Sequence, residues 1–129
     1  MPDILVEVRG GWIGNRKKQL LHAVHAALVA SIKTDPEDKV IRLVEHAPDD
    51  FIVPTPVGER FTRIEITMFA GRSIEAKRML YRTIVRTLLP FGIPAEDIKI
   101  VLVEVPLENV GIRGGQAACD IQLSYEVKV

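Results

Sequence analysis

The sequence predicts an α+β fold in which two helices cover one face of a four-stranded mixed sheet, with one more strand at the C-terminal end. Three observations lead to this prediction. The hydrophobic period alternates along the chain between that of a strand and that of a helix. Ile41 and Leu43 in the first half match Ile100 and Leu102 in the second, 59 positions later. Residues 121–129 alternate strictly between apolar and polar side chains.

The length and composition indicate one folded unit. The chain has 129 residues, of which 47% are hydrophobic and 26% charged, as in an ordinary globular domain. We expect a single domain over residues 1–129, with repeats at about 2–50 and 61–105 and an extension over 106–129. Its 17 basic and 17 acidic residues balance, which argues against a nucleic-acid or anionic membrane surface as a partner. No apolar run is long enough to span a bilayer, and we expect a cytoplasmic protein without a signal peptide.

The first repeat contains a strand, a helix and a strand. Ile4, Val6 and Val8 alternate with the residues between them and indicate the first strand. Apolar side chains then recur at helical spacing from Asn15, a suitable N-cap residue, to about Ile32. The aliphatic run over residues 40–46 indicates the second strand.

The second repeat has the same order. Proline and glycine punctuate residues 47–60, which we expect to be a connection. Alternation over 61–69 indicates a third strand, and a helix then runs from Ser73 to no further than Pro90. Residues 99–105 form the fourth strand. Each βαβ unit should pair its strands in parallel through a right-handed crossover, with both helices on one face.

The other face of such a sheet needs a covering partner. Apolar residues lie on both faces of the predicted strands, namely Leu5, Val40, Val101, Val103 and Val105, and residues 121–129 have no strand partner within the repeat. We therefore predict self-association that buries this second face.

The familiar catalytic motifs are absent. The chain has no P-loop, no Gly-x-Ser-x-Gly and no His-Glu-x-x-His sequence. His22 and His25 have a spacing that metal sites use, but no third ligand accompanies them, so we expect both to face solvent. Cys119 lies in a Gly/Ala-rich stretch, where a small apolar role is expected.

Pro2 is the first candidate for chemistry. An initiator methionine is generally removed when a small residue follows, which leaves a free secondary amine at the start of a core strand. An α-amino group titrates near pH 7.7–8.0, and apolar burial lowers this pKa, so the amine would act as a neutral base near pH 7. The alternative is that a Met-Pro start has no functional meaning.

Two arginines are candidate anion ligands. Arg72 lies where the third strand gives way to the second helix, and its guanidinium matches a carboxylate bidentately. The alternative is a surface arginine near a helix start. Arg113 belongs to the Gly-rich, hairpin-like segment over residues 109–116, which either approaches an anionic ligand closely or only turns the chain.

These features in combination resemble the tautomerase superfamily. The residues that carry the resemblance are the Met-Pro start, the duplicated βαβ unit, the junction Ala-Gly-Arg-Ser over residues 70–73 and the late segment over residues 109–115. The chain is most similar to the branch with malonate semialdehyde decarboxylase and to the macrophage migration inhibitory factor architecture. In that family the freed proline is a general acid or base, and trimers enclose a barrel-like core with active sites at or near subunit interfaces.

The resemblance assigns four site residues. Pro2 matches the catalytic proline, and Arg72 matches an arginine that positions a substrate carboxylate. Arg113, in the late segment, is assigned to substrate binding. Asp38 matches an aspartate that works with water and the proline, although a turn or capping role before the second strand is an equal alternative.

The departures from the family pattern narrow the expected substrate. Family members have an arginine at the position of Ala70 and an aromatic residue at the position of Val110. The short tautomerases have an arginine at the position of Trp12. Arg72 is then the single cation that matches an arginine of the family motif, which favours a small or monoanionic keto acid over a dicarboxylate.

The resulting hypothesis is a cofactor-independent and metal-independent homotrimeric tautomerase that interconverts the keto and enol forms of a small carboxylate substrate. Three alternatives remain at this point. The protein is a decarboxylase or hydratase of a three-carbon acid, a ferredoxin-like binding module, or a tautomerase-fold protein kept for interaction.

Overall fold

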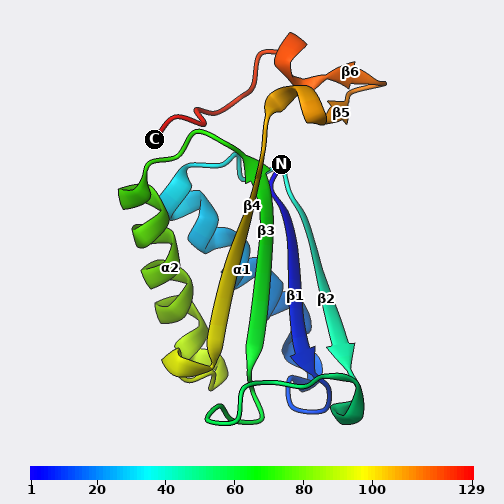
Figure 1. Ribbon diagram of the computed structural model, residues 1–129, viewed down its shortest axis with the longest axis vertical. Coiled ribbons are helices and arrows are strands. Elements are labelled where there is room, and N and C mark those ends of the chain that lie inside the picture. Colours follow the sequence, from blue (N-terminus) through cyan, green and yellow to red (C-terminus); the bar gives the residue numbers. More distant parts are fainter.

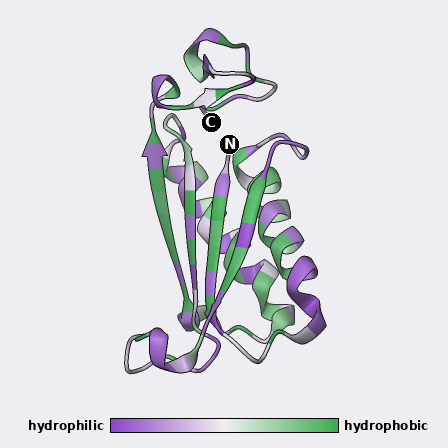
Figure 2. Ribbon diagram, turned by 90° about the vertical axis from the view of Figure 1, so that its right-hand side faces the viewer, coloured by the Kyte–Doolittle hydropathy of each residue, from purple (hydrophilic) through white to green (hydrophobic).

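Four strands form one mixed sheet in the computed structural model, which describes residues 1–129. The sheet order is β2-β1-β3-β4, and its strands are β1 (Asp3–Arg9), β2 (Val40–His46), β3 (Thr62–Phe69) and β4 (Ile98–Val105). Two helices, α1 (Lys17–Ile32) and α2 (Ile74–Leu88), lie together on one side of the sheet (Figures 1 and 2). The predicted fold class is confirmed. No helix is long and apolar enough to cross a membrane.

The strand pairing excludes one of the alternatives. β1 lies directly beside β2 and parallel to it, with Ile4 opposite Ile41, and β3 lies beside β4 in the same way. The central pair, β1 and β3, is antiparallel. A ferredoxin-like fold splits each βαβ unit by inserting another strand between its two strands. The ferredoxin-like binding module is therefore ruled out by topology.

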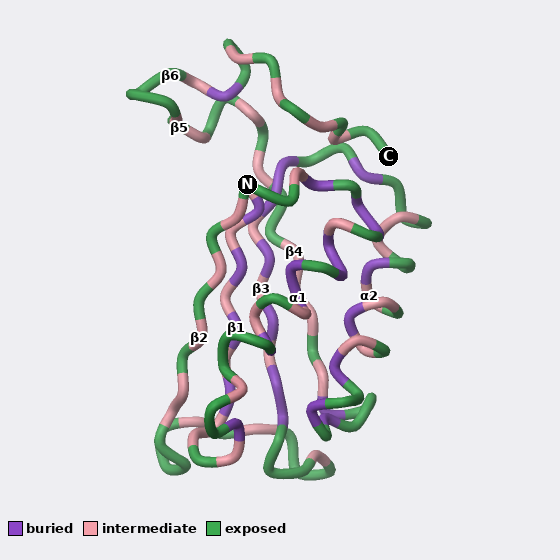
Figure 3. The backbone as a smooth tube through the Cα atoms, turned by 180° about the vertical axis from the view of Figure 1, so that it is seen from behind, coloured by how far each residue is buried: buried purple, intermediate pink, exposed green.

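The core lies between the sheet and the helices (Figure 3). Alternate residues of β1 and β3 point toward the helices and are fully buried, because side chains of a strand alternate between its faces. Apolar residues spaced three and four apart on each helix meet them. The fully buried side chains include Ile4, Val6, Leu20, Leu28, Ile64, Ile66, Leu80 and Ile84.

The two helices begin differently. Ser73 caps α2, since its Oγ accepts a hydrogen bond from the backbone N–H of Ala76 at 3.1 Å. Asn15 does not cap α1. It lies within a 3₁₀ turn over Gly14–Arg16, and the helix proper begins at Lys17 without a side-chain cap.

His25 contradicts the prediction that both histidines of α1 face solvent. His22 is exposed, but His25 is buried. α1 packs against both α2 and β2. Its side chains are therefore buried over more of the helix surface than the single apolar stripe on which the prediction was based. Burial lowers the pKa of His25, and the nearby charge of Lys39 lowers it further.

The sheet face opposite the helices, called the open face here, carries both apolar and charged side chains. By register, Leu5 of β1, Val44 of β2 and Val103 of β4 point to it. Glu7 forms an ion pair with Arg63 on the neighbouring strand, and Arg63 also bonds Glu65. Val40, Val44 and Val103 are more than one-third exposed.

The C-terminal segment departs from prediction. The hairpin is present, with β5 (Gly111–Ile112) paired to β6 (Gln116–Ala117), but residues 121–129 form no strand. A strand needs a neighbouring edge for its backbone hydrogen bonds, and this segment pairs with neither sheet edge of its own chain. It crosses instead the end of the molecule where β1 begins and β3 ends, so that both termini lie at that end (Figure 1).

Candidate active site

A cleft of about 270 Å³ opens at this end of the sheet. Three segments wall it: the turn over residues 35–38, the β5–β6 hairpin, and residues 123–125 of the C-terminal segment. Met1 and Phe69 complete the lining. The cleft is therefore built from segments distant in sequence, which the βαβ topology brings to one end of the sheet.

Pro2 is buried beside this cleft, immediately before β1. Its carbonyl accepts a hydrogen bond from the N–H of Val40 at 3.2 Å, which fixes the residue before β1 against the start of β2. Met1 lies over Pro2, and its terminal amine is 3.2 Å from Oδ1 of Asp38. The structure thus brings Pro2 and Asp38 into one neighbourhood.

Arg72 is buried, with only 6% of its surface exposed. Its Nη1 donates to the backbone carbonyl of Phe69 at 3.0 Å, whereas Nε and Nη2 are buried without a partner in the chain. Burial lowers the pKa of this guanidinium, although arginine remains charged in proteins. The alternative of an ordinary surface arginine is excluded. Buried N–H groups normally have partners, so two unpaired donors of a cation are a feature typical of an anion site.

Arg113 lines the cleft from the hairpin, with its side chain exposed. It has a positive φ of 50° in the three-residue loop between β5 and β6, and its carbonyl accepts a hydrogen bond from Nε2 of Gln116 at 3.0 Å. Arg72 does not line the cleft directly. It lies behind Tyr125, whose ring centroid is 5.8 Å from the guanidinium carbon.

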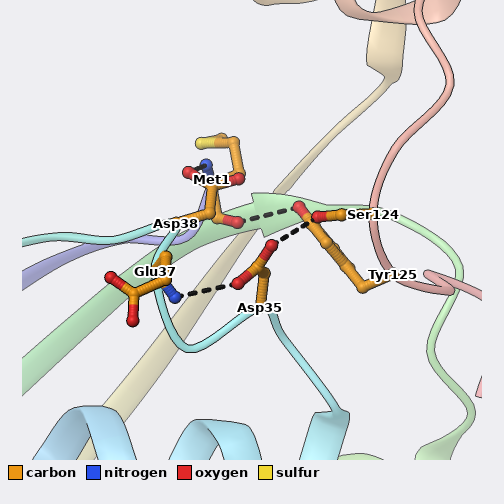
Figure 4. Close-up of polar contacts among 6 residues, drawn as sticks. All are labelled: Met1, Asp35, Glu37, Asp38, Ser124 and Tyr125. Carbon is orange, nitrogen blue, oxygen red and sulfur yellow. Dashed lines mark hydrogen bonds and ion pairs between the residues drawn. The ribbon is translucent and has the colours of Figure 1, made fainter.

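Sequence patterns did not single out the C-terminal contacts that close this cleft (Figure 4). Tyr125 Oη donates a hydrogen bond to the carbonyl oxygen of Met1 at 2.8 Å. Ser124 Oγ donates to Oδ2 of Asp35 at 2.6 Å. Only Asp35 had a local signal, since Asp-Pro is a common turn sequence. Tyr125 was one apolar position in an alternating segment.

Two groups in these contacts have displaced pKa values. Burial raises the pKa of Tyr125 to about 12, and the charge of Asp38 contributes in the same direction. The hydroxyl of Ser124 lowers the pKa of Asp35, helped by the backbone N–H of Glu37. At neutral pH the phenol is therefore a hydrogen-bond donor, and the Asp35 carboxylate is an acceptor.

The opposite end of the sheet holds the counterparts of these residues in the second repeat. Phe61 precedes β3 as Pro2 precedes β1, and Asp97 corresponds to Asp38. Asp97 is buried, and its Oδ2 accepts a hydrogen bond from the N–H of Gly58 at 3.1 Å. The two ends have diverged, because only the first carries a potential chain terminus.

Comparison with known proteins gives the family. A family model described as "Tautomerase enzyme" matches residues 38–113. The match covers more than half of the chain, and the protein belongs to the tautomerase superfamily. The resemblance inferred from the Met-Pro start, the duplication and the two arginine-bearing segments is thereby confirmed.

Solved structures agree with this assignment. The FG41 malonate semialdehyde decarboxylase inhibited by 3-bromopropiolate is 25% identical, with a TM-score of 0.79 over 88% of this chain and 91% of that one. The Q0 fused 4-OT symmetric trimer is 27% identical, with a TM-score of 0.81 over 91% and 96%. Pt0534 inactivated by 2-oxo-3-pentynoate shares the fold, at 22% identity and a TM-score of 0.83 over 93% and 99% of the two chains.

Proposed function

We propose that this protein is a tautomerase that interconverts the keto and enol forms of a small α-keto acid, with Pro2 as the general acid and base. The observation that carries the proposal is the buried Arg72, whose two unpaired donors lie at the same end of the sheet as Pro2. Membership of the tautomerase superfamily supports it. The proposal requires removal of Met1, because the nitrogen of Pro2 is not basic while it forms an amide bond with Met1.

In this mechanism the nitrogen of Pro2 takes a proton from the carbon beside the substrate carbonyl. The electron pair of the broken C–H bond becomes the new carbon–carbon double bond, and the carbonyl electrons move onto oxygen. The protonated Pro2 then returns its proton to that oxygen, which gives the enol and restores the neutral amine. Arg72 holds the carboxylate and stabilises the negative charge that spreads toward it.

The charges around the cleft support a substrate with a single negative charge. Asp35, Glu37 and Asp38 line it, and Arg113 is the basic side chain in the lining. A second carboxylate on the substrate would meet this acidic turn at close range, where like charges repel. We therefore propose monocarboxylates as the substrate class.

We further propose that the active form is a homotrimer. The open face presents Val40, Val44 and Val103 to solvent in the single chain. The Q0 fused 4-OT protein, which shares this fold, is a symmetric trimer. Burying the open face between copies would account for these exposed apolar side chains.

A second candidate is decarboxylation or hydration of a three-carbon acid. Asp38 favours it, since its carboxylate is 3.2 Å from the terminal amine of Met1 and so lies in the neighbourhood of Pro2, where it would orient water while a protonated Pro2 acts as the acid. The similarity to FG41 malonate semialdehyde decarboxylase is the second support.

Two measurements test the leading proposal. Intact mass of the purified protein should show the loss of one methionine. Ketonisation of phenylenolpyruvate should then fall at least about 100-fold in Pro2→Ala, the scale of general acid–base contributions, and remain unchanged in Pro54→Ala, an exposed proline of the connection. A retained methionine or equal rates in Pro2→Ala would refute proline catalysis.

Asp38→Asn separates the two candidate reactions. If ketonisation is the function, this variant keeps most of its activity on phenylenolpyruvate, because Arg72 and Pro2 are unchanged. If decarboxylation is the function, wild type releases carbon dioxide from malonate semialdehyde faster than it ketonises phenylenolpyruvate, and Asp38→Asn abolishes that release.

A further inference from the structure

We infer that Tyr125 is a catalytic residue of this site, whose hydroxyl donates a hydrogen bond to the substrate's carbonyl oxygen and to the enolate oxygen that forms from it. The inference rests on the proposed function and adds to it the group that stabilises charge on oxygen. It is carried by the contacts that Tyr125 makes on its two sides.

The first contact places the phenol at a carbonyl beside the catalytic nitrogen. Tyr125 Oη is 2.8 Å from the carbonyl oxygen of Met1, and the carbon of that carbonyl is bonded directly to the nitrogen of Pro2. The Met1 carbonyl therefore lies beside the reacting nitrogen, one bond closer to it than the carbonyl of a substrate whose neighbouring carbon approaches Pro2. Removal of Met1 takes away this acceptor and leaves the donor of Tyr125 directed at the incoming substrate.

The second contact places the same side chain beside the anion ligand. The ring of Tyr125 is 5.8 Å from the guanidinium carbon of Arg72, whose Nε and Nη2 are unpaired. An α-keto acid carries its carbonyl and carboxylate on adjacent carbons. A substrate with its carboxylate on Arg72 would therefore lie along the ring of Tyr125, with its carbonyl, one bond away, beside the same side chain.

The protonation state of the phenol suits this role. Burial raises its pKa to about 12, so it remains a donor throughout the pH range in which a neutral Pro2 accepts a proton. When the C–H electrons form the new double bond, the carbonyl electrons end on an oxygen that already receives the Tyr125 hydrogen bond. A donor aimed at the developing oxyanion is worth more in the transition state than in the ground state.

The rest of the C-terminal segment holds Tyr125 in this orientation. Ser124 is bonded to Asp35 on the facing turn, and the carbonyl of Val127 lies against Gly71. Contacts on both sides of Tyr125 therefore restrict its backbone, which reduces the freedom that the phenol must lose when substrate binds.

Kinetics of Tyr125→Phe test the assignment. This variant keeps the ring over Arg72 and removes only the hydroxyl, so kcat for phenylenolpyruvate should fall on the order of 100-fold, as for loss of one oxyanion donor, with KM changed little. The matched control is Tyr81→Phe, a change at the other tyrosine of the chain, which lies on α2. It should leave both kcat and KM unchanged. An unchanged kcat in Tyr125→Phe, at an unchanged melting temperature, would overturn the inference.

A spectroscopic measurement tests the hydrogen bond without turnover. Phenylpyruvate labelled with ¹³C at its carbonyl is bound to the Pro2→Ala variant, and its carbonyl resonance should lie downfield of the free ligand because a donor polarises the bond. The shift should disappear in Pro2→Ala/Tyr125→Phe and persist in Pro2→Ala/Tyr81→Phe. A shift that persists without the Tyr125 hydroxyl contradicts the inference, whereas undiminished turnover in Pro2→Ala contradicts only the proposed function.

Discussion

Gly71 and Val127 approach so closely that no side chain fits between them. A Cβ built on Gly71 would lie 2.9 Å from the carbonyl oxygen of Val127, and Gly71 also has a φ of 140° that other residues rarely adopt. This contact lies where β3 gives way to α2, next to the buried Arg72. The close packing of the C-terminal segment over this junction therefore depends on a missing side chain.

We predict that Gly71→Ala displaces residues 122–129 from the site. Amide hydrogen exchange in this segment should rise, and KM for phenylenolpyruvate should increase because Arg72 and Tyr125 no longer keep their arrangement. Gly11→Ala is the matched control, since Gly11 has a φ of 101° but nothing lies within 4 Å of the point that a Cβ would occupy there. Both variants carry backbone strain of about 1–3 kcal/mol, so equal exchange in the two would contradict the prediction.

We predict that Arg72→Met makes the protein more stable and less active. The buried guanidinium leaves two donors unpaired, a desolvation penalty of about 1–3 kcal/mol per unsatisfied group, of which methionine removes a part. Urea unfolding should show a gain of about 1 kcal/mol, while KM should rise at least about tenfold, the loss of one charged contact. Arg82→Met, at an exposed position of α2, should change neither. A stability loss with unchanged KM would show that Arg72 is structural.

The Ser124–Asp35 hydrogen bond should make docking of the C-terminal segment depend on pH. The pKa of Asp35 is lowered in the folded chain from its ordinary value of 3.8, so the stabilisation is present above that value and disappears as pH falls through the lower folded pKa. Ser124→Ala should therefore reduce the melting temperature at neutral pH, and this reduction should shrink progressively as the pH falls below 3.8. In an Asp35→Asn background the effect of Ser124→Ala should no longer vary with pH, and a persistent variation would assign it to another group.

Assembly through the open face can be tested by introducing a charged side chain on it. Val103→Arg places a cation among apolar side chains that we propose to be buried between copies, so light scattering should report a monomer in place of a trimer. Met79→Arg, at a half-exposed position on α2, should leave the trimer intact. A wild-type monomer, or a trimeric Val103→Arg, would contradict the proposed interface.

Local patterns were sufficient for the elements that pack within each repeat. The alternation around Ile4 and Ile64, and the helical spacing of Leu80 and Ile84, predicted strands and a helix that the structure contains. They were insufficient for residues 121–129, because alternation indicates that one face of a segment is buried but does not supply a partner strand. Asn15 failed as a cap for a related reason, since a 3₁₀ turn moved the start of α1 beyond it.

The candidate site was predictable where residues follow the family pattern. Pro2, Asp38 and Arg113 were expected together, and the structure places them around one cleft, with Arg72 behind it. Tyr125 and Ser124 could not be predicted, because they reach the site through contacts with residues about 90 or more positions earlier in the chain. Nothing in the local sequence of a segment encodes such distant contacts.

The duplication limits the number of reactive centres that one chain can contain. Peptide bonds join Phe61 to both of its neighbours, so removal of residues from the start of the first repeat exposes no basic backbone nitrogen in the second. Under the proposed mechanism, in which each unit depends on its own first residue, a fusion of two units therefore keeps one reactive centre of the two. The corresponding end of the second repeat has a structural role instead, because Asp97 joins the preceding connection to the start of β4. Substitutions at that end can therefore favour rigidity without a cost in turnover.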